Sequence, residues 1–320
     1  MPSRSANPFE KLFKVIPQLE KKRKSKIYCI LHGGDQHICS PTFWSVVRKR
    51  KEFSNIDTLE LLIHSPGGHP EISYQLMKFF RKNAKTVNVI VPIGAKSAAT
   101  LMCLGADSIF MGEFSELGPL DTQIEDPIEK GARPVSPIDD FKSMEFLREY
   151  AVEILDYFTL TFVKRYGISL KDALQHSGTC MGGLVSKLYE KIDPLEVGGH
   201  RRSLAIGEEY AKRLLGIVKN PNQKSIIQKL VWEYPSHDFA IDYDEALELG
   251  LPVKRLDLAQ DALLVEAVLE VMKHEVPFYG FVPQPKPKPK AAAKKAAKPT
   301  VVARKRAVQA AVGVNVSAAS

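Results

Sequence analysis

The chain has 320 residues, of which 44% are hydrophobic and 26% charged, a balance that is typical of a folded globular protein and excludes a fibrous or wholly disordered one. Its formal net charge of +8 is concentrated at one end. Nine of the 45 basic residues follow the last acidic residue, Glu275, so residues 1–275 hold 36 basic residues against 37 acidic ones. A basic nucleic-acid-binding surface spread over the fold is therefore not expected.

The four cysteines, Cys29, Cys39, Cys103 and Cys180, show no Cys-x-x-Cys spacing, which argues against a zinc site and a disulfide framework. The first 26 residues lack a continuous apolar stretch, and no window approaches the roughly 18 apolar residues of a membrane span. We therefore expect a reduced cytoplasmic protein without metal, cofactor or membrane span.

Strands and helices alternate along the first part of the chain. Residues 1–25 carry seven basic residues against two acidic ones and are expected to form a solvated leader or a short helix. Strands are then predicted at 27–31, 59–64, 87–91 and 108–111. Helices are predicted at 41–51, with Ser40 as N-cap and Pro41 in the first turn, after residue 68, with apolar positions at 72, 76, 79 and 80, and at 97–104. This alternation predicts parallel strands with right-handed crossovers in a layered α/β domain over residues 26–275.

After Pro119 helical patterns dominate. Helices are expected over about 140–166, 184–191, 203–215, 222–233, 243–249 and 258–273, with short strands at 239–241 and around 253. Residues 276–320 are assigned to a disordered basic tail, because the sequence from 283 onward alternates proline, lysine and alanine and has no aromatic residue. Such a tail is either solvated without a partner or makes non-specific, salt-sensitive contacts with nucleic acid.

The first motif that could take part in catalysis is Ser65-Pro66-Gly67-Gly68, at the end of a predicted strand. Two adjacent glycines let the backbone adopt positive φ angles and bring a bare N–H close to another atom, as an oxyanion site requires. The same four residues also fit an ordinary strand-to-helix turn.

The second motif surrounds Ser97, at the start of a predicted helix that follows a strand. Its hydroxyl is expected near unpaired backbone N–H groups, which favour developing negative charge, and the small residues Ala95, Ala98 and Ala99 leave room for a substrate. A serine at this position is also a common N-cap. Because one helix and one strand separate the two motifs, both are expected at the same carboxyl edge of adjacent parallel strands, where sites in α/β sheets form.

With these motifs the sequence resembles the ClpP/SppA group of serine peptidases, which have a ClpP/crotonase-like fold, and in particular the serine dehydrogenase proteinase (SDH-type) family. The resemblance is carried by residues 63–68, 95–100, 104–107 and 115–121, spans about 58–124, and continues weakly at 242–246 and 249–251. It implies that Ser97 is the nucleophile. It also implies that the oxyanion hole is formed by backbone N–H groups of Gly67 or Gly68 and of Ala98.

The general base is the open question of this site. ClpP-type enzymes place a histidine about 25 residues after the serine, but this chain has none between His69 and His176. SppA-like enzymes use a lysine before a helix, a position that Lys142 matches. A lysine can act as a base if burial lowers its pKa from about 10.4. The alternative bases or substrate contacts are Lys96, which could instead pair with Asp121 or Glu116, and the histidines His200 and His237.

The sequence therefore predicts a metal-independent serine peptidase that hydrolyses protein or peptide substrates through an acyl-enzyme at Ser97. The resemblance also implies a homo-oligomer. Three alternatives remain: an inactive scaffold that keeps the fold without a working base, a nucleic-acid-associated protein that acts through its tail, and an acyl-CoA enzyme of the crotonase type.

Overall fold

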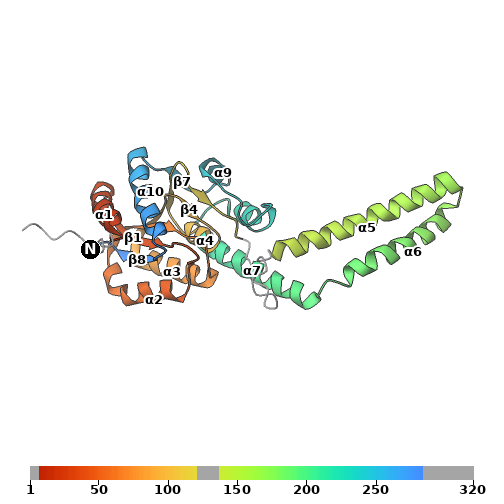
Figure 1. Cartoon of the computed structure of the whole chain (residues 1–320), viewed down its shortest axis with the longest axis horizontal. Coiled ribbons are helices and arrows are strands. Elements are labelled where there is room, and N and C mark those ends of the chain that lie inside the picture. The colour runs from red at the N-terminus through yellow and green to blue at the C-terminus, as the bar shows by residue number, and fades with distance from the viewer. Residues whose placement is uncertain (1–6, 121–136, 284–320) are drawn as a thin grey trace, which may run out of the picture. The chain divides into compact units, whose positions relative to one another are not determined.

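A computed structural model describes residues 7–120 and 137–283; at positions 137, 139 and 140 it describes the backbone alone. Its centre is a six-stranded sheet of order β7-β5-β3-β2-β1-β8, in which β8 alone is antiparallel (Figure 1). The strands are β1 (Lys26–Leu31), β2 (Ile56–His64), β3 (Ala84–Val91), β5 (Ser108–Met111), β7 (Val253–Arg255) and β8 (Phe278–Phe281). Two short strands, β4 (Gly94–Ala95) and β6 (Glu116–Leu117), form a second parallel pair.

Helix α1 precedes the first strand, and the other helices occupy connections between the strands (Figure 1). The helices are α1 (Glu10–Arg23), α2 (Ser40–Arg48), α3 (Pro70–Asn83), α4 (Ala98–Cys103), α5 (Pro137–Tyr166), α6 (Leu170–Tyr189), α7 (Pro194–Ile217), α8 (Gln223–Gln228), α9 (Tyr243–Glu248) and α10 (Leu258–Lys273), with a 3₁₀ turn η1 (Arg50–Phe53) and a π turn η2 (Lys229–Glu233). Within residues 7–120 and 137–283, no helix is both long and apolar enough to cross a bilayer.

Helices cover both faces of the sheet, which confirms the predicted layered α/β fold. On one face, side chains of α2, α3, α4 and α7 pack against alternate residues of β1, β2 and β3, such as Tyr28, Leu61 and Val89. On the other face, α1 and α10 cover the intervening residues, among them Cys29 and Leu62. Strands buried on both faces are expected of a parallel sheet between helical layers.

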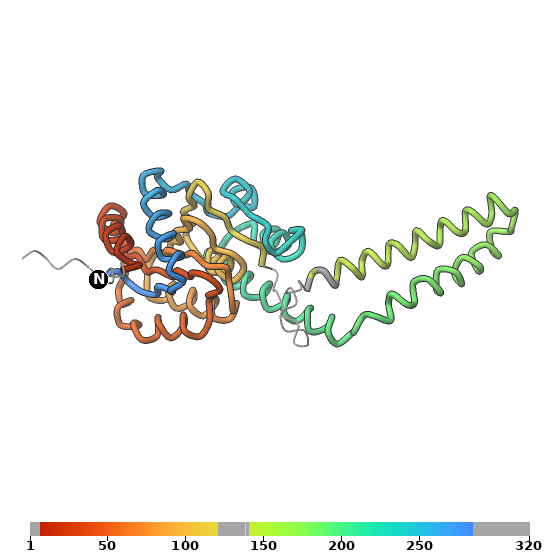
Figure 2. The backbone as a smooth tube through the Cα atoms, viewed as in Figure 1, coloured from red at the N-terminus to blue at the C-terminus, as the bar shows by residue number. Residues whose placement is uncertain are grey.

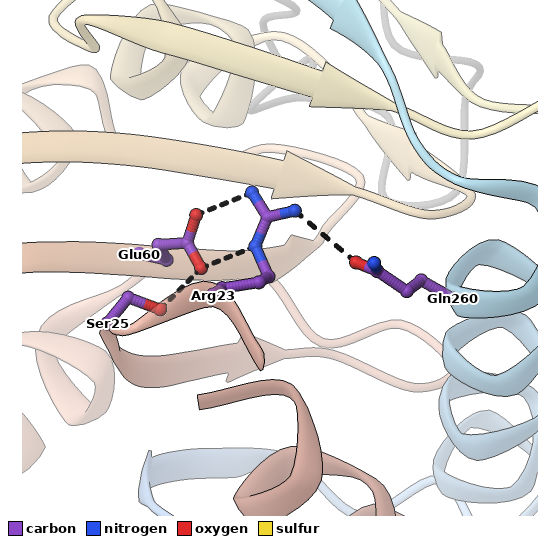
Figure 3. Close-up of polar contacts among 4 residues, drawn as sticks. All are labelled: Arg23, Ser25, Glu60 and Gln260. Carbon is purple, nitrogen blue, oxygen red and sulfur yellow. Dashed lines mark hydrogen bonds and ion pairs between the residues drawn. The ribbon is translucent and has the colours of Figure 1, made fainter. Parts of the chain in front are cut away.

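The N-terminal helix α1 packs against the rest of the fold. Of the two structures expected for this segment, a short helix or a solvated leader, it therefore forms the helix. Leu12, Ile16 and Leu19 are buried against α10 and β1. At the end of α1, Arg23 binds Glu60 of β2 and Gln260 of α10, while Ser25 also donates to Glu60 (Figure 3). These contacts join three segments that are far apart in the sequence, namely the end of α1, β2 and α10.

Four other local expectations differ from the structure. Cys39, not Ser40, is the N-cap of α2, because Ser40 already lies inside the helix. Residues 239–241 form no strand and contribute only a single bridge between Ile241 and Leu117. The helix expected at 184–191 is the last part of the longer helix α6. Finally, residues 278–281, which were assigned to the disordered tail, form strand β8 and pair with β1. Residues 284–320 lie outside the described residues.

Helices α5 and α6 run side by side and are joined by a short turn (Figure 2). Many of their large apolar side chains are exposed, among them Tyr157, Leu160, Tyr166, Leu170 and Leu184. Folded domains rarely leave so many such residues in contact with water on one element.

Candidate active site

The turn that follows β2 requires both of its glycines. Gly67 has φ 125° and Gly68 has φ 131°, a region that residues with a side chain avoid. A Cβ atom at Gly68 would also collide with the backbone oxygen of Ile38. The side chain of Ser65 holds the turn, since its Oγ accepts from Gly67 N at 3.1 Å and donates to Gly67 O at 3.2 Å.

Ser97 lies on a strained turn between β4 and α4. It is the N-cap of α4 and has φ 48° and ψ −117°, an unfavourable conformation for a non-glycine residue. Thr100 stabilises this turn: its Oγ1 donates to Ala95 O at 2.6 Å and accepts from Gly118 N at 3.0 Å. Strained residues of this kind are concentrated at functional sites, and a serine nucleophile on a sharp strand-to-helix turn is a known example.

Backbone hydrogen bonds join the two turns directly. Ser65 N donates to Gly94 O at 3.1 Å, and Lys96 N donates to Ser65 O at 3.0 Å. A Cβ atom built on Gly67 would lie 2.8 Å from Ser97 Cβ and 3.3 Å from Ser97 Oγ. The serine hydroxyl and the glycine turn are therefore neighbours at the carboxyl edge of the sheet.

A small cavity of about 20 Å³ lies at this junction and has room for one water-sized group. Gly68, Ser97 and Ala98 line it together with the apolar residues Pro70, Leu101 and Leu120 and with Gly207 of α7. None of these residues carries an ionisable side chain.

Two backbone donors of this cavity are unused. Among the described residues, neither Gly68 N nor Ala98 N has a protein acceptor. Gly67 N, by contrast, already donates to Ser65 Oγ. Because two N–H groups beside a hydroxyl can stabilise a negatively charged oxygen, the geometry favours the pair Gly68 and Ala98 over Gly67 and Ala98.

The two candidate lysines are engaged elsewhere. Lys96 Nζ lies 2.9 Å from Glu116 Oε1 and donates to Phe239 O at 3.3 Å. Lys142 Nζ donates to Tyr234 O at 3.1 Å and lines a different, larger cavity. The expected pairing of Lys96 with Glu116 is thus present, whereas Lys142 does not line the cavity at Ser97.

The remaining candidates do not line this cavity among the described residues. His200 is buried on α7 and His237 is half-buried in the segment after η2, and neither lines the cavity that contains Ser97. Asp121 lies outside the described residues.

Sequence reasoning missed a buried histidine, His32, after β1 and a half-buried one, His64, at the carboxyl end of β2. Burial lowers the pKa of His32 to about 4 and also lowers the pKa of His64. Among the described residues, no side chain or backbone group bonds to either ring nitrogen of His32. Their position at the end of a strongly apolar strand was the available signal, since such a histidine is expected to lose much of its exposure.

Several known proteins resemble this chain. Residues 6–129 match the family of ClpP-like SDH-type serine proteinases, which confirms the predicted resemblance; the matched segment contains both turns. The uncharacterized protein MJ0137 of Methanocaldococcus jannaschii is 25% identical over 250 residues, which are 75% of this chain and 72% of its own length. The uncharacterized protein MJ1495 of the same organism is 25% identical over 124 residues, which are 36% of this chain and 42% of its own length.

A solved structure with some likeness is a mutant of the 1510-N membrane-bound stomatin-specific protease. It is 14% identical to this chain, with a TM-score of 0.27 over 47% of this chain and 69% of that one.

Proposed function

Taking the match of residues 6–129 to the ClpP-like SDH-type serine proteinases as the premise, we propose that this chain hydrolyses peptide bonds with Ser97 as nucleophile. The observation that carries the proposal is the shared cavity of the Ser97 hydroxyl and the unused N–H groups of Gly68 and Ala98. A hydroxyl beside two preorganised donors is the arrangement that acyl transfer needs.

In this reaction Ser97 Oγ attacks the carbonyl carbon of the substrate and passes its proton to a neutral amine base. The N–H groups of Gly68 and Ala98 hold the oxyanion that forms. When the tetrahedral intermediate collapses, the protonated base returns the proton to the departing amine, and Ser97 keeps the acyl group as an ester. Water then hydrolyses the ester by the same sequence of proton transfers.

For the base we propose a lysine, and Lys142 is the first candidate. To act on Ser97, its Nζ has to leave Tyr234 O, to which it donates in the structure. Lys96 is the second candidate. Its side chain is only 18% exposed and its Nζ lies 2.9 Å from Glu116 Oε1, so it too has to leave its partner before it can reach Ser97.

The experiment is labelling with a fluorophosphonate probe, which forms a covalent bond with activated serines. We expect the wild-type chain to be labelled and the Ser97→Ala variant not to be labelled. The control is Ser186→Ala, an exposed serine of α6, which should be labelled like wild type. An unlabelled wild-type chain supports the inactive-scaffold alternative, and turnover of an acyl-CoA thioester without peptide cleavage supports the crotonase-type alternative.

We also propose that the chain forms a homo-oligomer through α5 and α6. The support is the set of exposed apolar side chains on these helices, which a second copy would cover. Replacing Tyr157 and Leu160 together by glutamate should reduce the molar mass measured by light scattering to that of a monomer. Leu258→Glu on α10 also removes an exposed apolar residue and should leave the mass unchanged. A wild-type chain that is monomeric at tens of micromolar would contradict this proposal.

A further inference from the structure

A second and much larger cavity, of about 800 Å³, lies between α5, α7 and η2. Its volume is within the range of about 300–1,000 Å³ that is usual for ligand sites. Phe141 and Trp232 form an aromatic part of its wall, and Lys142, Arg148 and Arg201 contribute cationic groups. None of these residues is part of the cavity at Ser97.

Helix α7 lines both cavities. Gly207 lines the small cavity at Ser97, and the next residue, Glu208, lines the large one. The segments on either side are also joined, because Leu120 N, beside Ser97, donates to Leu230 O at 2.8 Å and Leu230 lies two residues before Trp232. A ligand in the large cavity therefore lies next to the wall of the proposed catalytic site.

The arrangement of Arg201 is suited to binding a carboxylate. Its guanidinium lies 4.9 Å from the ring centre of Trp232 and 5.9 Å from that of Phe141. A guanidinium that uses its faces for aromatic rings keeps the N–H groups at its edge for a planar, bidentate partner. Within the part of the chain that the structure describes, no carboxylate forms an ion pair with Arg201.

The acidic residues of the cavity already have partners. Glu208 accepts a short hydrogen bond from Trp232 Nε1. Glu145 pairs with Arg148 at 3.4 Å, but both side chains are about two-thirds exposed, and such i,i+3 pairs are weak enough to exchange for another carboxylate. The cavity thus has three cationic side chains, those of Lys142, Arg148 and Arg201, and two carboxylates that already have partners. It therefore attracts an anion.

From this arrangement we propose that the cavity binds a peptide segment that carries a carboxylate next to an apolar side chain. Arg201 and Arg148 bind the carboxylate, and Trp232 and Phe141 contact the apolar side chain. An internal aspartate or glutamate and a free carboxyl terminus supply the same group. The inference rests on the proposed peptidase function only in taking the bound peptide to be a substrate or product of Ser97.

Tryptophan fluorescence tests binding without catalysis. The chain has two tryptophans, so Trp44→Phe leaves Trp232 as the single reporter, and Ser97→Ala prevents cleavage. The full-length double variant is titrated with three hexapeptides. The first alternates leucine and glutamate and has blocked ends, and the second has glutamine in place of each glutamate. The third is the glutamine peptide with a free carboxyl terminus. The first should change Trp232 emission and bind about tenfold or more tightly than the second, because a charge-assisted hydrogen bond contributes about 1.5–3 kcal/mol.

The third peptide separates the two sources of the carboxylate. Binding as tight as that of the glutamate peptide shows that the cavity accepts a carboxylate from either source, tighter binding assigns it to chain ends, and binding as weak as that of the blocked glutamine peptide assigns it to internal acidic residues. Equal affinity of all three peptides, or no change of emission with any, would overturn the proposal. Affinity should also fall as salt is raised, since screening weakens the attraction.

Variants locate the bound carboxylate. Arg201→Gln should weaken the glutamate peptide about tenfold, and Arg201→Lys should recover part of that loss because it keeps the charge without the bidentate geometry. Arg202→Gln, at the next position of α7 but outside the cavity, is the matched control and should bind like the parent. An unchanged affinity in Arg201→Gln, with an unchanged melting temperature, contradicts the assignment.

The outcomes are separable from those of the proposed function. If Ser97 is labelled by the probe and the peptides do not bind, the peptidase proposal stands and the role of the cavity is lost. If the peptides bind and Ser97 is not labelled, the cavity is a peptide site on a chain without the proposed chemistry. If Ser97 is labelled and the peptides bind, Arg201→Gln should raise KM for the glutamate substrate and leave kcat close to that of wild type. The reason is that the substitution removes an interaction that is equally strong in the ground state and in the transition state.

Discussion

Arg23 and Glu60 form a bidentate ion pair inside the protein, with Nε to Oε2 at 2.7 Å and Nη2 to Oε1 at 2.6 Å (Figure 3). Glu60 is 2% exposed and also accepts from Ser25 Oγ at 2.6 Å. Arg23 is further surrounded by Gln260 and by the ring of Phe110, whose centre is 4.1 Å from Cζ. The pair connects α1 to the centre of the sheet, on the face opposite α3 and α4.

Removing one partner of this pair should destabilise the fold strongly. Arg23→Met leaves the buried carboxylate of Glu60 without its counter-charge, which typically costs about 3–5 kcal/mol. Urea unfolding measures the loss. Adding Glu60→Leu should restore much of it, since replacing both charges with apolar groups is often neutral.

The exposed pair Lys85–Asp57 is the matched control. Its atoms are 2.7 Å apart, but both side chains are more than four-fifths exposed. Lys85→Met should therefore change the free energy of unfolding by less than about 1 kcal/mol. Similar losses for Arg23→Met and Lys85→Met would show that burial of the Arg23 pair is unimportant.

Substitution of Gly68 should slow the proposed reaction strongly. A methyl group there collides with the backbone of Ile38, and φ 131° is unfavourable for alanine, so the N–H of residue 68 has to move. Loss of one oxyanion donor slows acyl transfer by about 10²–10³. The rate of probe labelling of Gly68→Ala measures this, beside circular dichroism to show that the chain is folded.

Gly182→Ala provides the contrast. No heavy atom lies within 4 Å of a Cβ built on Gly182, and the residue lies inside α6. This variant should be labelled like wild type and should gain up to about 1 kcal/mol of stability, because alanine is the better helix former. A folded Gly68→Ala chain that reacts at the wild-type rate would remove Gly68 from the oxyanion hole.

Variants of Lys142 and Lys96 test which lysine acts as the general base. If Lys142 accepts the proton of Ser97, Lys142→Gln should lower the rate of probe labelling by about 10²–10⁴ and remove its rise with pH. Lys96→Gln should retain most of the rate and mainly lose the contacts with Glu116 and Phe239. The opposite result transfers the role to Lys96, and full activity of both variants excludes a lysine base at either position.

Acidification should destabilise the protein through His32. Its folded-state pKa of about 4 lies below the usual value of 6.5, because the ring is 1% exposed beside Tyr279. Below pH 6.5 the unfolded chain therefore binds a proton that the folded chain does not. The contribution of His32 to stability is complete above about pH 6.5 and is lost progressively as the pH falls. At pH 4 the loss amounts to about 3 kcal/mol.

Denaturant unfolding between pH 7 and pH 4 measures this slope for His32→Leu and for the wild type. The variant should lose less stability over that interval, although His64 keeps part of the dependence. His176→Gln, on the exposed side of α6, should follow the wild-type curve. Parallel curves for all three proteins would exclude His32 as the source.

Local patterns were sufficient to predict most of the central architecture and the two turns. The strand that ends at His64 and the double glycine after it are encoded within a few residues, since only glycine tolerates these φ angles. The alternation of strands and helices up to Met111 likewise follows from short apolar runs and their spacing. Parallel pairing then brings the turns at Gly68 and Ser97 to one edge.

Only the tertiary structure decided which distant segments meet. The pairing of β8 with β1 joins residues about 250 positions apart, and nothing in the local pattern of 278–281 specifies that partner. The burial of α1 depends on α10, and the first part of α6 was missed because Gly178, Gly182 and Gly183 weaken its helical pattern. The large cavity and the contact of Lys142 with Tyr234 depend on the packing of α5 near η2, which sequence spacing cannot determine because a side chain's partners are set by the other elements of the fold.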